Sequence, residues 1–331
     1  MRALVGLLLA GGGLAVSAAE RNTIVEPRLT LAEIYTDNVD HDVDARRRSD
    51  LVTQALPGIA VARRTPHSLL QLDYQLEGLV YARGTHSDHV YQRLFGNLHT
   101  EPVPDWFDLD AGAIIGQTII DAAGTLSTSN VVGGRNRTEV RTYTLAPAFD
   151  HRFRGVHVHA GVRWQATRYQ RGASDSDGRV YDLRLSDADH LPFLHWNLSY
   201  LDQKYDRKTT TDVHFRNLEG QVRYRLFRGF HLVARAGRAD NAYQGVDDRR
   251  NGNYWAAGAG WQGRRFAVDV LDGRNDKGVT LGWTPNVRTQ VDVTYRNRKV
   301  GRVHGPEWRG RITHRTRHTR LGFLYQESTQ S

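Results

Sequence analysis

The stretch LQLDYQLE at residues 70–77 alternates apolar and polar side chains without a break. Successive side chains of a β-strand point to opposite faces, so Leu70, Leu72, Tyr74 and Leu76 would share one face and the four polar side chains the other. A helix would instead spread the polar residues around its circumference. The pattern therefore predicts a strand with one apolar and one polar face.

The same alternation recurs along the chain, for example in VHVHAGVRW at 156–164, QVRYRL at 221–226 and QVDVTY at 290–295. About seventeen such strands are expected, the first near 26–37 and the last near 320–327. Several exceed the ~9–11 residues that cross a bilayer at a tilt, whereas ordinary soluble strands have ~5–6. The sequence therefore predicts an all-β fold, a transmembrane antiparallel up-and-down β-barrel of about 16–18 strands.

The joints between these strands alternate in length, which is typical of bacterial outer-membrane barrels with short periplasmic turns and long outer loops. Short joints are expected at 63–66, 102–104, 154–155, 228–229, 263–264 and 285–286. Longer polar loops are expected at 38–50, 121–137, 171–179, 240–253 and 272–278. This pattern places the short joints in the periplasm. Bacterial single-chain barrels have even strand numbers, so the odd count predicts that the chain is incomplete at its C-terminus.

The first residues have the features of a cleavable leader. Arg2 is followed by an apolar run over 4–14 and by small residues at 16–19. This predicts a secretory signal peptide at 1–19 and an outer-membrane β-barrel domain at 20–331. The chain has no cysteine. Its stability is therefore expected from backbone pairing in a closed sheet rather than from disulfides.

The formal net charge of +9 raises nucleic acid as a partner. However, the arginines are spread over nearly every expected strand, and no nucleic-acid-binding motif is present. A basic lumen with basic rims is the simpler interpretation, so no nucleic acid is expected to bind. The mean hydropathy of −0.56 agrees with a barrel, because its apolar residues alternate with polar ones.

No motif points to catalysis. The chain has neither a Cys nucleophile nor a G-x-S-x-G elbow, so no enzyme and no cofactor are expected. A membrane-embedded hydrolase would need a Ser–His pair brought together by the fold. The pairs His157/His159 and His86/His89 lack further ligands at motif spacing, so no metal site is expected.

The polar faces of the strands supply the candidate pore-lining residues. By parity these are Asp73, Gln75, Glu77, Asp110, His157, His159, Arg163, Arg223, Arg225 and Asp292. A wall of mixed charges and amides can carry water, ions or sugar hydroxyls. The same side chains could also cross-link one another and close the pore, and the sequence leaves both alternatives open.

Several stretches resemble one family: LAEIYTDNV at 31–39, SDLVTQALPGI at 49–59, DWFDLDA at 105–111 and HRTR at 314–317. They are similar to the outer-membrane β-barrel family associated with the PEP-CTERM/exosortase system of Gram-negative bacteria, over most of the mature chain. The resemblance implies an integral outer-membrane protein that acts in exopolysaccharide export or assembly, as a passive conduit or an assembly component. Its implied partners are outer-membrane lipid and lipopolysaccharide, exopolysaccharide and periplasmic export components. The family supplies no catalytic residues.

Two further functions remain open from the sequence. One is a non-conducting structural or adhesion barrel that binds a partner through its outer loops. The other is a secreted soluble β-protein that binds carbohydrate, in which the face of Leu70, Leu72 and Leu76 would be buried in a protein core. Conductance in a planar bilayer would separate the first from an open conduit.

Overall fold

The computed structural model describes residues 5–6, 22–40, 46–121, 130–131, 136–188, 191–209, 211–242, 251–301 and 305–328. Contacts divide the chain into two compact units. Unit 1 comprises Met1–Pro147, Arg163–Asp177 and Arg207–Thr210, and unit 2 comprises Ala148–Val162, Gly178–Asp206 and Thr211–Ser331. No helix among the described residues is long and apolar enough to cross a membrane.

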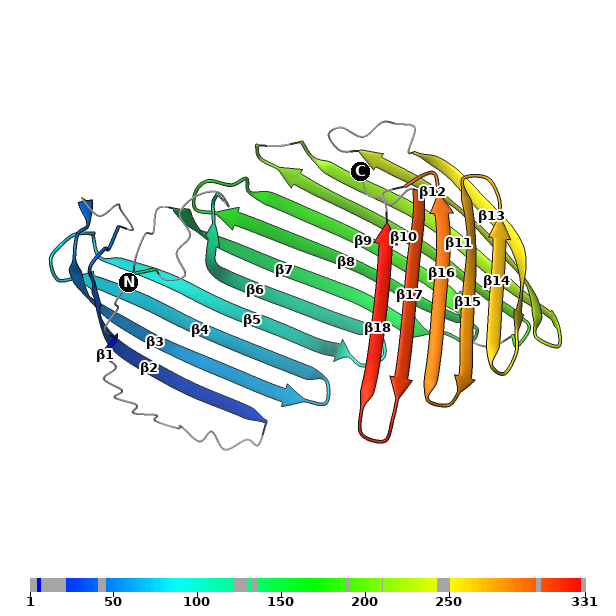
Figure 1. Ribbon diagram of the computed structural model, residues 1–331, viewed down its shortest axis with the longest axis horizontal. Helices are drawn as coiled ribbons and strands as arrows, with labels where there is room; N and C mark the ends of the chain where they lie inside the picture. Colours follow the sequence, from blue (N-terminus) through cyan, green and yellow to red (C-terminus); the bar gives the residue numbers. More distant parts are fainter. Residues whose placement is uncertain are drawn as a thin grey trace. The chain divides into compact units, whose positions relative to one another are not determined.

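Unit 1 is built mainly from a run of antiparallel strands in which each strand pairs with the next (Figure 1). They are β2 (Thr23–Thr36), β3 (Asp50–Thr65), β4 (Ser68–Tyr81), β5 (His89–Val103) and β6 (Phe107–Ile119). Unit 1 also holds β7 (Arg137–Arg152) as far as Pro147 and β8 (Val156–Tyr169) from Arg163 onward. The two-residue strand β1 (Val5–Gly6), the described part of the expected leader, pairs with Ile34 and Glu33 of β2.

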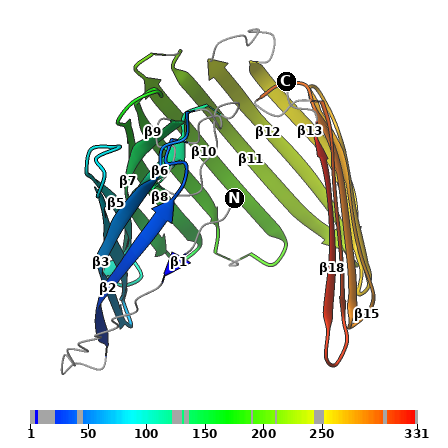
Figure 2. The same ribbon diagram turned by 60° about the vertical axis from the view of Figure 1, so that its left-hand side comes forward.

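Unit 2 has the same antiparallel pattern, and successive strands from β10 to β18 pair in order. Figure 2 shows β10 to β13 side by side. Its strands are β9 (Ser176–Asp187), β10 (Leu194–Arg207), β11 (Val213–Phe227), β12 (Phe230–Ala242), β13 (Gly252–Gln262), β14 (Phe266–Asp272), β15 (Asp276–Asn286), β16 (Thr289–Arg298), β17 (Gly305–Arg315) and β18 (Arg320–Ser328). The predicted all-β, antiparallel up-and-down class is confirmed. The described ranges hold seventeen strands after the leader, β2 to β18, as expected.

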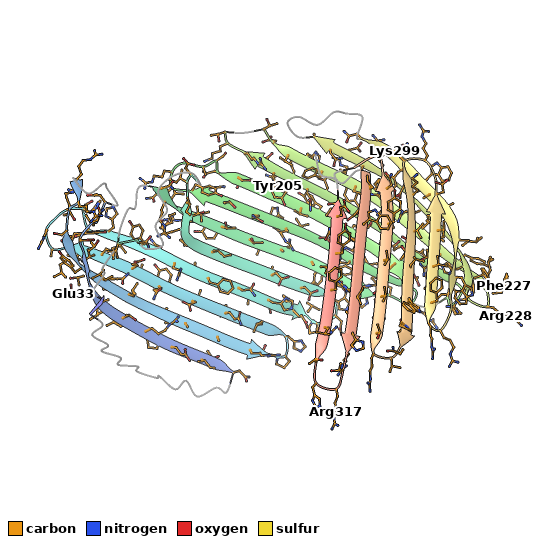
Figure 3. The ribbon with its side chains drawn as sticks, viewed as in Figure 1. Glu33, Tyr205, Phe227, Arg228, Lys299 and Arg317 are labelled. Carbon is orange, nitrogen blue, oxygen red and sulfur yellow. The ribbon has the colours of Figure 1, made fainter. Side chains whose placement is uncertain are left out.

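The connections between strands lie at the two ends of the strands. We call the end with the short turns the short-turn end and the opposite end the long-loop end. Phe227, Arg228 and Arg317 lie at the short-turn end of unit 2, whereas Tyr205 and Lys299 lie at its long-loop end (Figure 3). Arg228 has a positive φ of 39° and is followed by Gly229 with a φ of 89°. This tight turn between β11 and β12 matches the expected short joint at 228–229.

Three of the expected long loops are wrong in extent, because the loop expected at 240–253 also overlaps β12, which ends at Ala242, and β13, which begins at Gly252. The loop expected at 272–278 is only the connection 273–275, because β14 ends at Asp272 and β15 begins at Asp276. Its polar residues indicated a loop, but Asp276 is a fully buried strand residue. The loop expected at 171–179 ends early, because β9 begins at Ser176. Within the loop expected at 240–253, residues 243–250 lie outside the described part of the chain.

The apolar faces of the strands are exposed. In unit 2, Leu218, Val222, Leu232, Val270 and Trp283 are each 43–51% exposed. The strand pairings from β11 to β15 place these five side chains on one face of the sheet. A soluble β-sandwich would bury such a face against a second layer. Monomeric soluble proteins rarely expose an apolar patch larger than a few hundred Å², so this face needs another environment.

The buried apolar residues instead form small clusters at the long-loop ends. In unit 1, Val39, Val52, Leu79, Tyr81 and Val131 pack together, and each is at most 8% exposed. In unit 2 a second cluster holds Ala239, Tyr254 and Val300. These clusters join strand ends to loop residues, so they fix the loops against the polar face rather than form one central core.

Candidate functional site: a polar cleft of unit 1

A cleft of about 390 Å³ lies at the long-loop end of unit 1. Its lining combines aromatic, amide and charged side chains: Tyr81, His86, His89, Val90, Tyr91, Gln117, Asn130, Val131, Arg137, Glu139, Gln170 and Arg171. A second cavity of about 320 Å³ shares Tyr91, Gln117, Asn130 and Arg137 with it and adds Gln54, Gln75, Glu77 and Arg93 among others. We call the two together the polar cleft.

Asp50 fixes the loop that borders the cleft. This aspartate begins β3 and is fully buried. Its carboxylate accepts hydrogen bonds from the backbone N–H groups of Leu51 at 2.8 Å, Arg83 at 2.9 Å and Thr85 at 3.2 Å, and from the Thr85 hydroxyl. Burying a carboxylate is costly unless its oxygens accept hydrogen bonds, so these donors must stay in place around Asp50. The segment 82–88, which carries His86, is thereby held at a defined place beside the cleft.

A continuous chain of hydrogen bonds crosses the cleft. Gln54 Nε2 donates to Glu77 Oε1 at 2.7 Å, and Asn130 Nδ2 donates to Glu77 Oε2 at 2.6 Å. A guanidinium nitrogen of Arg137 donates to Asn130 Oδ1 at 2.8 Å. Arg137 Nε is buried and has no hydrogen-bond partner within the described part of the chain. An unsatisfied buried donor is costly, so this nitrogen is suited to an acceptor supplied by a ligand or water.

Aromatic rings form another side of the cleft. The ring of Tyr91 stacks on His89 with centroids 5.9 Å apart, and Tyr81 lies 5.3 Å from the ring of His86. The Tyr81 hydroxyl donates to the backbone oxygen of Val131 at 3.1 Å. Flat rings beside amides, a carboxylate and arginines can contact both the faces and the hydroxyl groups of a polar ligand.

A charged pair lies outside the strands at the same end of unit 1. Lys208 Nζ lies 2.7 Å from Asp175 Oδ2, and the backbone N–H of Tyr169 donates to Asp175 Oδ1 at 2.9 Å. The ammonium group of Lys208 and the Tyr169 amide lower the pKa of the Asp175 carboxyl below 3.8. The pair ties the connection between β8 and β9 to the end of β10.

The predicted pore-lining residues of unit 1 fall into separate places. Gln75 and Glu77 line the polar cleft. Asp73 instead forms an ion pair with Arg28 at 2.6 Å, and Asp110 lies 2.9 Å from His99. Arg163 and Asp110 line a third cavity of about 350 Å³. The structure therefore brings only two of these residues into the cleft, and a role for any of them in a pore stays a prediction.

Some of the predicted pore-lining residues of unit 2 lie close together in the structure. Arg223 pairs with Asp269 at 2.7 Å and, like Arg225, lines a cavity of about 620 Å³. His157 and His159 each contact Asp150, at 2.8 and 2.9 Å. Asp292 lies apart and accepts a hydrogen bond from Gln290 at 2.9 Å.

The sequence did not indicate an ion network on the polar face of unit 2, formed by side chains of β11, β12, β15 and β16. Asp276 is fully buried and contacts Arg235 at 2.8 Å, Arg296 at 3.1 Å and Arg298 at 3.6 Å. Arg296 and Arg298 also contact Glu219. The guanidinium of Arg298 lies 3.8 Å above the ring of Tyr254. We call this set the arginine network.

Parity could have placed most of the network on the polar face. Glu219 lies two residues before Gln221, and Arg296 lies two after Thr294, so each continues the alternation of its strand. The partner of each side chain could not be predicted, because Arg298 and Glu219 are 79 residues apart. Asn130 of the polar cleft lies in a long joint and Arg137 is the first residue of β7, so alternation gave no signal for either.

An antiparallel up-and-down sheet with one exposed apolar face and one hydrogen-bonded polar face has the organisation of membrane-spanning β-barrels. No family model matches the sequence, and no curated protein matches it either. Solved structures that are similar include the copper transporter OprC, with 13% identity over 93% of this chain and a TM-score of 0.37. This chain spans 63% of the length of OprC.

Two other similar structures come from named organisms. A loop-deletion mutant of OmpT, an outer membrane protein of Vibrio cholerae, is 8% identical, with 92% of this chain and 97% of that chain covered and a TM-score of 0.32. A mutant ferric enterobactin receptor, PfeA, from Pseudomonas aeruginosa is 9% identical, with 97% and 73% covered and a TM-score of 0.33. At these TM-scores the likenesses support no inference about what this chain binds or transports.

Proposed function

We propose that this protein is an integral outer-membrane β-barrel whose apolar strand faces contact lipid. The observation that carries the proposal is the exposed apolar face, on which large side chains such as Leu232 and Trp283 are about half exposed. Lipid can cover that face, because each strand from β11 to β17 pairs its backbone with a neighbouring strand on both sides. Lipid and lipopolysaccharide of the outer membrane are then its immediate surroundings, and export requires the leader at 1–19.

The proposed task is the passage or assembly of exopolysaccharide. The polar cleft supports it, because Gln54, Glu77, Asn130 and Arg137 offer alternating donors and acceptors beside the ring of Tyr91. Such a surface suits hydroxyl-rich chains. The resemblance at 31–39 and 49–59 to the PEP-CTERM/exosortase-associated barrel family points to the same task, with periplasmic export components as partners. A passive conduit needs no catalytic residues.

Bilayer recordings and gel behaviour test the proposal together. Purified protein refolded in detergent is expected to shift its gel mobility on heating and to produce channels in a planar bilayer. Short neutral and acidic oligosaccharides are expected to interrupt the current. A protein that inserts and shifts on heating but never conducts would instead be a non-conducting structural or adhesion barrel. The arginine network, which cross-links the polar face of unit 2, favours that second function.

Protein that fractionates as soluble and shows no heat-dependent shift would contradict both membrane functions. It would instead support a secreted β-protein. Oligosaccharide block that persists unchanged after the cleft is altered, for example by Glu77→Gln, would show that sugars pass without using the cleft.

A further inference from the structure

One histidine and two carboxylates meet near the short-turn end of unit 1. His99 and Glu101 lie two residues apart on β5, and Asp108 and Asp110 lie two residues apart on β6. The register of β5 and β6 places His99 directly opposite Asp110. One ligand atom from each of His99, Glu101 and Asp108 lies within 4.8 Å of the other two. No second group of this kind occurs among the residues that the structure describes.

A local irregularity of β5 holds Glu101 in this group. The register between β5 and β6 shifts between Thr100 and Val103, as in a β-bulge. Bulges re-aim side chains and are common next to functional sites. The backbone N–H of Glu101 donates to the carbonyl oxygen of His67 at 2.8 Å, and the Thr100 hydroxyl donates to the same oxygen at 3.2 Å. The bulged segment is therefore fixed to the turn between β3 and β4.

Further side chains surround the three candidate ligands. His99 Nδ1 lies 2.9 Å from Asp110 Oδ1, which fixes the orientation of the imidazole. Histidines that bind metals almost always donate their other ring N–H to a carboxylate, a backbone carbonyl or a water, and Asp110 can be that partner here. His67 Nδ1 lies 3.1 Å from Glu101 Oε2, so a second imidazole stands beside a candidate ligand. Three carboxylates and two imidazoles thus share one small region of the polar face.

We propose that His99, Glu101 and Asp108 bind a divalent transition metal ion of the zinc class, with Asp110 as a positioning residue. Imidazole and carboxylate together suit zinc, copper or nickel, whereas calcium and magnesium prefer oxygen alone. Bonds of about 2.0–2.1 Å to a tetrahedral zinc ion place ligand atoms about 3.3 Å apart, so only small side-chain rotations are needed. The dication also offsets the repulsion among the three carboxylates.

The site is open to its ion, because the side chains of His99 and Glu101 are 42% and 35% exposed. It lies on two hydrogen-bonded strands and one turn, so binding would clamp the β5–β6 hairpin to the turn at His67. This inference does not depend on the passage of exopolysaccharide. A barrel of any function, or a soluble protein with this fold, would retain the site.

Metal competition tests the site in the full chain. Tag-free protein, refolded in detergent and stripped with a chelator, is titrated with Zn²⁺ against a chromophoric chelator. His99→Ala and Asp108→Asn are expected to weaken the tightest binding at least tenfold. Asp110→Ala is expected to weaken it about 10–100-fold, as loss of an orienting carboxylate typically does. Cu²⁺-loaded wild type and Asp110→Ala should both show imidazole nitrogen coupling by electron paramagnetic resonance, and His99→Ala should show it reduced.

His195→Ala is the matched control. His195 also pairs with an aspartate, Asp187 at 2.8 Å, but belongs to no group of three ligands among the described residues. It should bind Zn²⁺ like the wild type, and all variants must keep the wild-type far-ultraviolet circular dichroism spectrum. Equal Zn²⁺ affinity in wild type and His99→Ala would overturn the proposal. Displacement of Zn²⁺ by equimolar Ca²⁺ would also overturn it.

Discussion

The polar faces of unit 1 and unit 2 use the same alternation of side chains but are filled differently. In unit 1, amides such as Gln54 and Asn130 share one carboxylate, Glu77, and leave cavities of about 390 and 320 Å³. In unit 2, the fully buried Asp276 is surrounded by arginines, so charge cross-links that part of the polar face, whereas a cavity of about 620 Å³ lies beside Arg225 and Gly229, nearer the short-turn end. Alternation thus decides which face a side chain occupies, whereas its charge and length decide whether the face stays open.

The largest effect is expected from breaking the arginine network. Asp276→Ala leaves Arg235, Arg296 and Arg298 without their central carboxylate, and removing one partner of a buried ion pair costs about 3–5 kcal/mol. The measurement is the free energy of unfolding by urea in lipid vesicles, followed by tryptophan fluorescence. Asp240→Ala is the control, because the exposed Arg238–Asp240 pair should contribute at most about 1 kcal/mol. Equal costs for the two variants would contradict the central role of Asp276 in the arginine network.

A smaller effect is expected from a substitution in the polar cleft of unit 1. Glu77→Gln replaces a carboxylate oxygen with an amide N–H₂ group that faces the N–H₂ groups of Gln54 or Asn130. Loss of charged hydrogen bonds of about 1.5–3 kcal/mol should raise the concentration of oligosaccharide needed to block the channel about 10–100-fold. Glu307→Gln in unit 2 is the control and should leave the blocking concentration unchanged. A reversed pattern would place sugar binding in unit 2.

The packing of neighbouring strands gives the next prediction. A Cβ atom added at Gly258 of β13 would lie 1.8 Å from the carbonyl oxygen of Val270, whereas one added at Gly116 of β6 would meet nothing within 4 Å. Gly258→Ala should therefore lower the free energy of unfolding by about 1–3 kcal/mol. Gly116→Ala should change it by less than about 0.5 kcal/mol. The same urea titration measures both, and similar values would contradict the closer packing at Gly258.

The smallest effect concerns the Asp175–Lys208 pair. Because the folded pKa of Asp175 lies below 3.8, its contribution to stability is present above that pH and is lost as the pH falls through the folded pKa. Wild type should thus be more stable than Asp175→Asn at neutral pH, and the difference should shrink below pH 3.8. Urea midpoints of the two proteins across this range give the measurement. A stability difference that grows on acidification would contradict the lowered pKa of Asp175.

The fold could largely be predicted from sequence, because alternation is a local property. The first strand, expected near 26–37, is Thr23–Thr36, and the last, expected near 320–327, is Arg320–Ser328. The connection 273–275 could not be predicted, since the acidic residues around it favoured a longer loop. A carboxylate such as Asp276 can lie inside a strand because arginines from β12 and β16 neutralise it.

The candidate site could be predicted only in part. Alternation placed Gln75 and Glu77 on the polar face, and both line the polar cleft. It did not indicate Asn130, which reaches Glu77 across 53 residues of sequence. Nor did it bring His99, Glu101 and Asp108 together, because their proximity depends on strand register and on the bulge after Thr100. Side-chain partners set by register cannot be deduced from one strand at a time.

The most direct test of the account is a spin-label scan along β12 in lipid vesicles. The chain has no cysteine, so single-cysteine variants at 232–236 carry one label each. If the apolar face contacts lipid, labels at Leu232, Ala234 and Ala236 will be accessible to oxygen but not to a water-soluble nickel chelate. Labels at Val233 and Arg235 will show low oxygen accessibility. Absence of this alternation, with Leu232 shielded from oxygen and the protein soluble, would contradict the membrane-spanning barrel.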